Sequence, residues 1–168
     1  MSRKTTRHMV ADYLRAADIL GVGTVFASPP KISTSRDAFA NVPAGTASGS
    51  VVYVEILQSA EVRVAVGGPT AGKKIVTHQL RLHLLFRSTQ RVAEDAMDDH
   101  DDIIEALLAL LRADRTLGTT TSSPSPIFQN GEGDAGITVA TGMPKESGSG
   151  ATIVWSLVDT DCLEFITA

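Results

Sequence analysis

The segment Ile75–Arg87 places the strongest constraint on the fold of this chain, because its apolar side chains recur at every second residue. Successive side chains of an extended strand point to opposite faces, so a period of two predicts a strand with one face in a core and one in water. That pattern is typical of an antiparallel sheet covered on a single side. His78 falls on the apolar face, where we expect a core histidine with satisfied polar atoms, and Leu85 is the apolar exception on the polar face. The apolar face carries Val76, Leu80, Leu82, Leu84 and Phe86, and the polar face carries Thr77, Gln79, Arg81, His83 and Arg87.

Further strands are predicted before and after this segment. Val51–Leu57 and Glu61–Val66 are both rich in β-branched residues, and we expect them to form an antiparallel hairpin with its turn near Gln58–Ala60. The other strands are predicted at Val22–Ala27, Ile137–Thr141 and Ala151–Phe165.

Two segments carry the helical spacing of three and four residues. Thr5–Leu20 is amphipathic, and Gln90–Leu111 is the strongest helix signal in the chain. The stripe that the second helix is expected to bury is Ala93, Ala96, Met97, Ile103, Ile104, Leu107, Leu108 and Leu111. The fold class predicted from this order is α+β: a mostly antiparallel β-sheet with two helices packed on one face.

The remaining segments and the composition limit how the chain can be organised into domains and loops. The chain has 168 residues, which suits a single domain over 1–168. Residues 28–50 and 119–150 are rich in Gly, Ser and Pro, and we expect long flexible loops there.

The longest apolar run, Ala106–Leu111, is far shorter than the roughly 20 residues that span a bilayer, so no membrane partner is expected. Cys162 is the single cysteine, which favours a reducing compartment and a buried thiol rather than a nucleophile.

The charge balance argues against a dedicated nucleic-acid binder. Fifteen Lys and Arg stand against nineteen Asp and Glu, giving a net charge of −4. Binding to phosphates needs a surplus of basic side chains.

One apparent nucleotide motif fails on inspection. Gly67–Lys74 matches the glycine-rich phosphate-binding pattern G-x-x-x-x-G-K, but Lys74 occupies the Ser/Thr position that should bind Mg²⁺. A strand also follows where a helix N-terminus should receive the phosphates. We therefore expect a hairpin connection and no cofactor.

The second helix is unusually acidic. Asp98 and Asp102 lie four residues apart and are a possible metal pair, but a helix displays such side chains outward, whereas hard cations need several converging oxygens. A solvated or subunit-facing acidic surface is the favoured interpretation, one that would attract basic groups of a neighbouring subunit. The candidate interface residues are the acidic Asp98, Asp99, Asp101 and Asp102 and the basic Lys73, Lys74, Arg81, His83 and Arg87.

Other catalytic patterns are missing from the sequence. The four histidines lack metal-ligand spacing, and Gly148-Ser149-Gly150 lacks the frame of a nucleophile elbow. We expect no enzymatic activity.

The second half of the chain resembles a known family. A long strand leads into Asp98-Asp99-His100-Asp101-Asp102-Ile103-Ile104-Glu105-Ala106-Leu107 and then into Arg112-Ala113-Asp114-Arg115-Thr116-Leu117-Gly118. This order resembles the tail terminator, or head–tail joining, proteins of long-tailed bacteriophages, in which a "D-x-I-x-x-A-L" helix ends in a "D-x-T-L-G" segment before a last strand. The likeness is best over Ile75–Ala168, and residues 28–50 do not align.

The resemblance implies a structural virion protein at the head–tail junction, assembled in the host cytoplasm. Such a subunit forms a homo-oligomeric ring, six-fold in that family, which caps the head-proximal end of the tail tube and stops its polymerisation. The implied partners are further copies of the chain, the tail tube protein and a head-completion or connector protein. Genomic DNA would pass through the ring lumen without sequence-specific contact.

Three alternatives stay open. The first is a head-completion or connector protein of the same particle. The second is a small ligand- or nucleic-acid-binding module that uses Lys73, Lys74, Arg81 and Arg87. The third is a metal-dependent hydrolase that uses Asp98 and Asp102.

Overall fold

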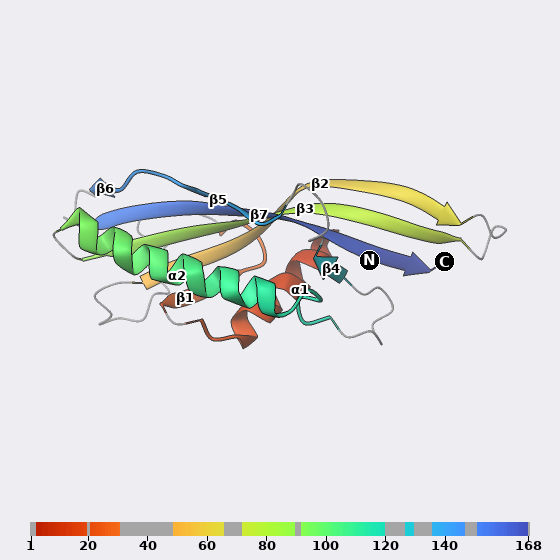
Figure 1. Cartoon of the computed structure of the whole chain (residues 1–168), viewed down its shortest axis with the longest axis horizontal. Helices are drawn as coiled ribbons and strands as arrows, with labels where there is room; N and C mark the ends of the chain where they lie inside the picture. The colour runs from red at the N-terminus through yellow and green to blue at the C-terminus, as the bar shows by residue number, and fades with distance from the viewer. Residues whose placement is uncertain are drawn as a thin grey trace.

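The protein is built on one twisted sheet with both helices on the same face, as the computed structural model in Figure 1 shows. The structure describes residues 3–19, 21–30, 49–65, 72–89, 92–119, 127–129, 136–146 and 151–167. Within these ranges the helices are α1 (Arg3–Ala16) and α2 (Ala93–Ala113). The strands are β1 (Val22–Phe26), β2 (Gly49–Ala65), β3 (Lys73–Ser88), β4 (Ile127–Gln129), β5 (Thr138–Thr141), β6 (Lys145–Glu146) and β7 (Thr152–Thr167).

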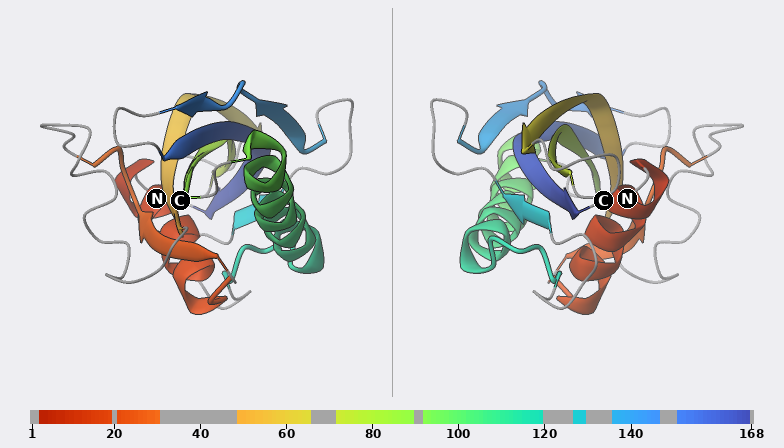
Figure 2. Two further views of the ribbon diagram at one scale, coloured as in Figure 1. Left: turned by 90° about the vertical axis from the view of Figure 1, so that its left-hand side faces the viewer. Right: turned by 90° about the vertical axis from the view of Figure 1, so that its right-hand side faces the viewer.

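The sheet order is β1-β2-β3-β7-β4, and β5 and β6 also pair with β7. The pairs are antiparallel except β1 with β2, which is parallel and was not expected from the sequence. Seen end on, the sheet arches over α1 and α2 (Figure 2). The predicted α+β class is therefore confirmed.

The long central strands obey the predicted period of two. The even-numbered residues 76–88 of β3 and 152–164 of β7 are buried on the face that carries the helices, called here the inner face. Odd-numbered residues lie on the opposite, outer face and are half-buried or exposed. Leu85, the apolar exception, joins a small outer-face cluster with Val51, Phe26 and Ile153.

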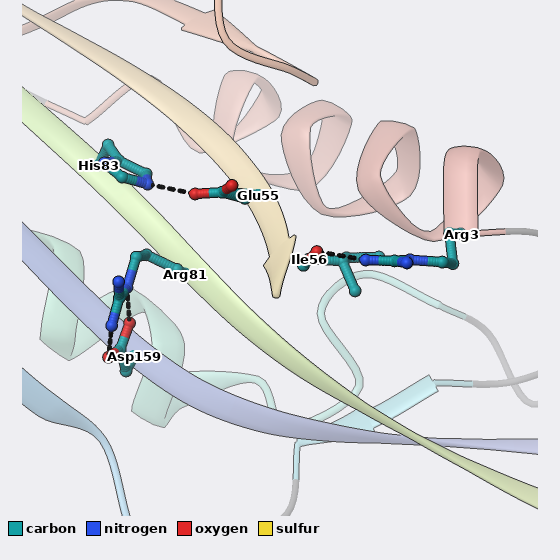
Figure 3. Close-up of polar contacts among 6 residues, drawn as sticks. All are labelled: Arg3, Glu55, Ile56, Arg81, His83 and Asp159. Carbon is teal, nitrogen blue, oxygen red and sulfur yellow. Dashed lines mark hydrogen bonds and ion pairs between the residues drawn. The ribbon is translucent and has the colours of Figure 1, made fainter. Parts of the chain in front are cut away.

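The predicted hairpin between Val51–Leu57 and Glu61–Val66 is wrong. Val51–Leu57 and the described part of the second segment, residues 61–65, belong to the single strand β2 and pair with β3. The register shifts between Ile56 and Gln58, because Leu57 is the extra residue of a β-bulge. Before the bulge the even-numbered residues of β2 face inward, and after it the odd-numbered residues do. In the sequence, this change makes one strand look like two. The Arg3 side chain donates a hydrogen bond to the Ile56 carbonyl beside the bulge (Figure 3).

The helix ends differ from the predicted bounds of Thr5–Leu20 and Gln90–Leu111. α1 ends at Ala16, and a turn through Asp18, whose φ is +46°, leads to Gly21 at φ +85°. A Cβ on Gly21 would lie 2.8 Å from the side chain of Ile103, so α2 approaches this turn too closely for any side chain.

The core lies between the inner face and the two helices. Leu107 and Leu111 of the predicted stripe are 0% and 1% exposed. Met97 and Leu108 are half-buried at its margin, and Ala93 in the first turn of α2 is exposed, which corrects its predicted burial. Neither of the two described helices is long and apolar enough to cross a membrane.

The predicted flexible loops are only partly testable. Residues 31–48 lie outside the described residues, and so do 120–126, 130–135 and 147–150. The loop prediction is wrong for 127–129 and 145–146, which form β4 and β6. Thr138–Thr141 forms β5, which confirms the strand predicted at Ile137–Thr141, and the three strands follow one another along one edge of β7. Pairing to that edge makes strands of segments too short to carry a periodic signal of their own.

Candidate functional site

Two charged surfaces lie at opposite ends of the long axis of the sheet. We define the acidic surface as the exposed carboxylates of α2: Glu94, Asp95, Asp98, Asp99, Asp101, Asp102 and Glu105. We define the arm tip as residues 61–65 of β2, 73–76 of β3 and 165–167 of β7. In Figure 1 the strands run past both helices to the arm tip, far from the first turns of α2.

Few positive charges on α2 balance the negative charge of the acidic surface. Its seven carboxylates share α2 with a single basic side chain, Arg112 in the last turn. Within the described ranges no three His, Cys, Asp or Glu side chains converge as metal ligands, around Asp98 and Asp102 or elsewhere. Carboxylates that face outward without convergence suit attraction to a basic partner surface rather than chelation.

His100 lies in the middle of this acidic run but faces inward and is 0% exposed. Its Nε2 lies 3.1 Å from Ser156 Oγ of β7, and that hydroxyl is 2.8 Å from Thr141 Oγ1 of β5. Burial lowers the pKa of His100, opposed by its hydrogen bond with Asp101. The burial of His100 was not predicted from the sequence, although its spacing from Ala96 and Ile103 fits the apolar stripe.

Arg81 and His83 lie on the outer face, as predicted, but each already contacts a carboxylate. Arg81 makes a bidentate contact with Asp159, with both N–O distances at 2.7 Å. His83 Nε2 lies 2.7 Å from Glu55 (Figure 3). The His83 ring stacks on Tyr53 at a centroid distance of 4.1 Å. This corrects the picture of a basic stripe: the centre of the outer face is a mixed ion-pair network.

The two carboxylate partners were not predicted as part of a site. Glu55 and Asp159 are the direct cross-strand neighbours of Arg81. Opposite charges in directly paired positions stabilise a sheet, but they can be recognised only when the register is known.

The other basic candidates are dispersed. Lys73 is exposed at the arm tip, where Lys74 Nζ lies 2.8 Å from Glu61 Oε1. That contact lowers the pKa of Glu61. Arg87 is exposed at the other end of β3, directly opposite Gly49. The predicted interface residues therefore fall into three groups: the arm tip, the middle of the outer face and α2.

A pocket of about 280 Å³ opens beside the acidic surface. Asp99 and Asp102 line it together with apolar side chains of α2 and β3. The remaining lining residues are Gly21, Gly49, Phe86, Ile103 and Ala106. Charged groups beside apolar walls give it the character of a socket for a cation on an apolar stem.

A buried hydrogen-bonded chain crosses the inner face near the arm. Ser59 Oγ lies 2.8 Å from His78 Nδ1, and His78 Nε2 lies 3.0 Å from Glu164 Oε2. A carboxylate only accepts, so Nε2 of His78 donates to Glu164, and Nδ1 shares a hydrogen bond with the Ser59 hydroxyl. His78 is 2% exposed and Glu164 is 0% exposed, so this Ser–His–Glu chain links β2, β3 and β7 rather than facing a substrate.

The prediction of a satisfied core histidine at position 78 is thus confirmed. Cys162 pairs with His78 across the strands and is also buried, which confirms its predicted burial. Burial and the nearby Asp161 raise the pKa of its thiol, so it stays protonated and unreactive.

The D-x-T-L-G segment forms the turn that ends α2. Asp114 Oδ1 accepts hydrogen bonds from the backbone N–H of Thr116 at 2.8 Å and from its hydroxyl at 2.6 Å. Leu117 is buried at φ +49°, and Gly118 follows at φ +74° against the ring of Tyr13. The motif that carries the family resemblance is therefore a structural turn holding α2 against α1.

The likeness to known proteins lies among solved structures. No family model matches the chain, and no curated protein does. A chain from the virion of a native gene transfer agent particle is similar at 13% identity and a TM-score of 0.33, over 94% of this chain and 93% of that one.

Proposed function

We propose that this chain is a structural virion protein, the subunit of a ring that caps the head-proximal end of a phage tail tube. In this role it stops tube polymerisation and joins the tail to the head. The proposed partners are other copies of the chain, the tail tube protein and a connector protein, and DNA passes through the lumen. The role involves no catalysis and no cofactor.

The separation of two opposite charges along the long axis is the observation that supports self-assembly. The acidic surface carries seven carboxylates, whereas the arm tip carries Arg63, Lys73 and Lys74 against the single exposed carboxylate of Glu61. A chain with these surfaces at opposite ends cannot pair them within itself (Figure 1).

Between copies, the same surfaces are complementary. An arm tip of one copy on the acidic surface of the next is a heterologous contact, which repeats until the rotation between copies closes a ring. Exposed apolar side chains at the arm tip add area to such a contact: Val62 is 61% exposed and Val64 is 58% exposed.

The motif resemblance supplies the place of this ring in the particle. The acidic helix and its Asp114–Gly118 turn follow the family order, and the turn has a clear structural purpose here. A small subunit with charged ends and a sheet face free of helices within the described residues is suited to stacking between a tube and a connector.

Removal of the gene from the phage that encodes it tests this role. Loss of a terminator gives tails of uncontrolled length, and this is the expected result. Normal-length tails beside heads that leak DNA would instead identify a connector protein and refute the terminator role. Complementation with the wild-type chain is the control, and tail lengths are measured by electron microscopy.

A further inference from the structure

We infer that the pocket beside α2 is a socket for Arg63 from the arm tip of a neighbouring copy. This inference rests on the proposed function, because it names the contact that joins one subunit of the ring to the next.

The pocket has the chemistry that a guanidinium group requires. Asp99 and Asp102 lie three residues apart on α2, so their carboxylates are neighbours on one face of the helix. The planar guanidinium group presents several donors and can bond to both carboxylates. The apolar walls from Phe86 and Ile103 suit the methylene stem behind it.

The pocket also has the size of a side-chain socket. Its volume of about 280 Å³ is just below the roughly 300–1,000 Å³ of sites for drug-sized ligands. One long side chain inserted from outside fits this space better than a folded cofactor does.

Arg63 is the arm-tip cation that best matches the pocket. It is exposed, and it is the arginine among the basic side chains of the arm tip, so it carries the planar guanidinium group that two carboxylates can share. Lys74, its cross-strand neighbour, is already held by Glu61 at 2.8 Å.

The pocket and Arg63 of one chain cannot meet, because the arm tip points away from α2 along the long axis (Figure 1). The occupant is therefore a second copy, and charge complementarity selects the acidic end of that copy. The contact joins unlike surfaces, as a ring requires.

Reciprocal charge reversal tests this contact. The mass of the purified full chain is measured by light scattering over a concentration series at low salt. Arg63→Glu and Asp102→Arg are each expected to weaken association at least about tenfold. The combined Arg63→Glu, Asp102→Arg variant is expected to recover most of that loss, because it restores the pair with its direction reversed.

Asp98→Arg is the matched control, since it makes the same charge change on the exposed surface of α2 outside the pocket. It is expected to weaken association much less than Asp102→Arg. Equal weakening by both variants, or no recovery in the combined variant, overturns the socket while leaving the ring intact. A wild-type chain that stays monomeric at every concentration and does not bind tail tubes overturns the proposed function itself.

Discussion

The carboxylate of Asp114 accepts a hydrogen bond from the backbone N–H of Gly118 at 3.0 Å, four residues further along the chain. This bond closes the turn after α2 and explains two residues of the motif. Asp114 supplies an acceptor for the turn, and Gly118 adopts φ +74° where a Cβ would lie 2.9 Å from the Tyr13 ring. Tyr13 in turn donates to the Leu110 carbonyl at 3.1 Å, so the turn connects both helices.

Replacing Asp114 by Ala is expected to lower the free energy of unfolding by about 1–2 kcal/mol, because it removes a cap that accepts from several donors. Urea denaturation at neutral pH measures the loss. Asp114→Asn keeps one acceptor oxygen and should lose less. Equal losses in the two variants would mean that the charge rather than the acceptor geometry matters.

The same carboxylate predicts a pH dependence. Hydrogen bonds from Thr116 and Gly118 lower the pKa of Asp114 from its ordinary value of 3.8. Its contribution to stability is therefore present above pH 3.8 and is lost as the pH falls through the lowered folded-state pKa. The difference in stability between wild type and Asp114→Ala should shrink in that acid window, as thermal melts in a pH series would show.

The burial of His100 predicts a second pH dependence of stability, which comes from a basic group and occurs at milder pH. Burial lowers its pKa below the ordinary value of 6.5, so the unfolded chain binds a proton that the folded chain does not. Stability should fall as the pH drops below 6.5, and the fall should level off at the folded-state pKa. His100→Gln should remove this component of the pH profile. An unchanged profile in the variant would show that His100 is not the titrating group.

The apolar stripe of α2 predicts a large cavity effect. Leu107→Ala or Leu111→Ala should each cost about 2–5 kcal/mol, since both side chains are buried inside one subunit. Glu105→Ala, on the exposed side of the same helix, is the control and should change stability by less than about 0.5 kcal/mol. A near-zero effect of the leucine variants would mean that α2 is not packed on the sheet in the free subunit.

The buried pair of His78 and Glu164 predicts non-additive losses. His78→Ala should cost about 3–5 kcal/mol, because it takes away the imidazole that bonds to a fully buried carboxylate. Replacing both residues by leucine should cost less than His78→Ala alone. A loss of stability in the double variant equal to the sum of the losses in the two single variants would show that the two side chains do not interact.

The spacing of apolar residues was sufficient to predict the elements whose burial pattern repeats within their own segment. The alternation in Ile75–Arg87 predicted β3, its inner face and the satisfied core histidine at position 78. The stripe in Gln90–Leu111 predicted α2 with an end error of two or three residues. Each of these elements is long enough to repeat its own pattern several times.

Features that depend on pairing between distant segments were not predictable in the same way. The bulge at Leu57 changes the phase of β2, and only the register against β3 shows that the strand continues. The pairing of Arg81 with Asp159 needs the alignment of β3 with β7, across 78 positions in the sequence. The short strands β4 and β6, which were not predicted, exist because the long edge of β7 offers them partners.

The candidate site likewise has one part that was predicted from the sequence and one part that was not. The acidic surface was predicted because seven carboxylates crowd one helix. The pocket beside it was not, because it forms where α2 passes the turn at Gly21 and the start of β2 at Gly49.

Negative-stain electron microscopy of the purified protein at high concentration and low salt tests whether the chain assembles into rings. Closed rings are expected, six-fold in projection, with a lumen wide enough for duplex DNA (roughly 20 Å or more), and they should dissociate when salt screens the charged ends. Open filaments, or separate particles under all conditions and in the presence of tail tubes, would contradict ring assembly.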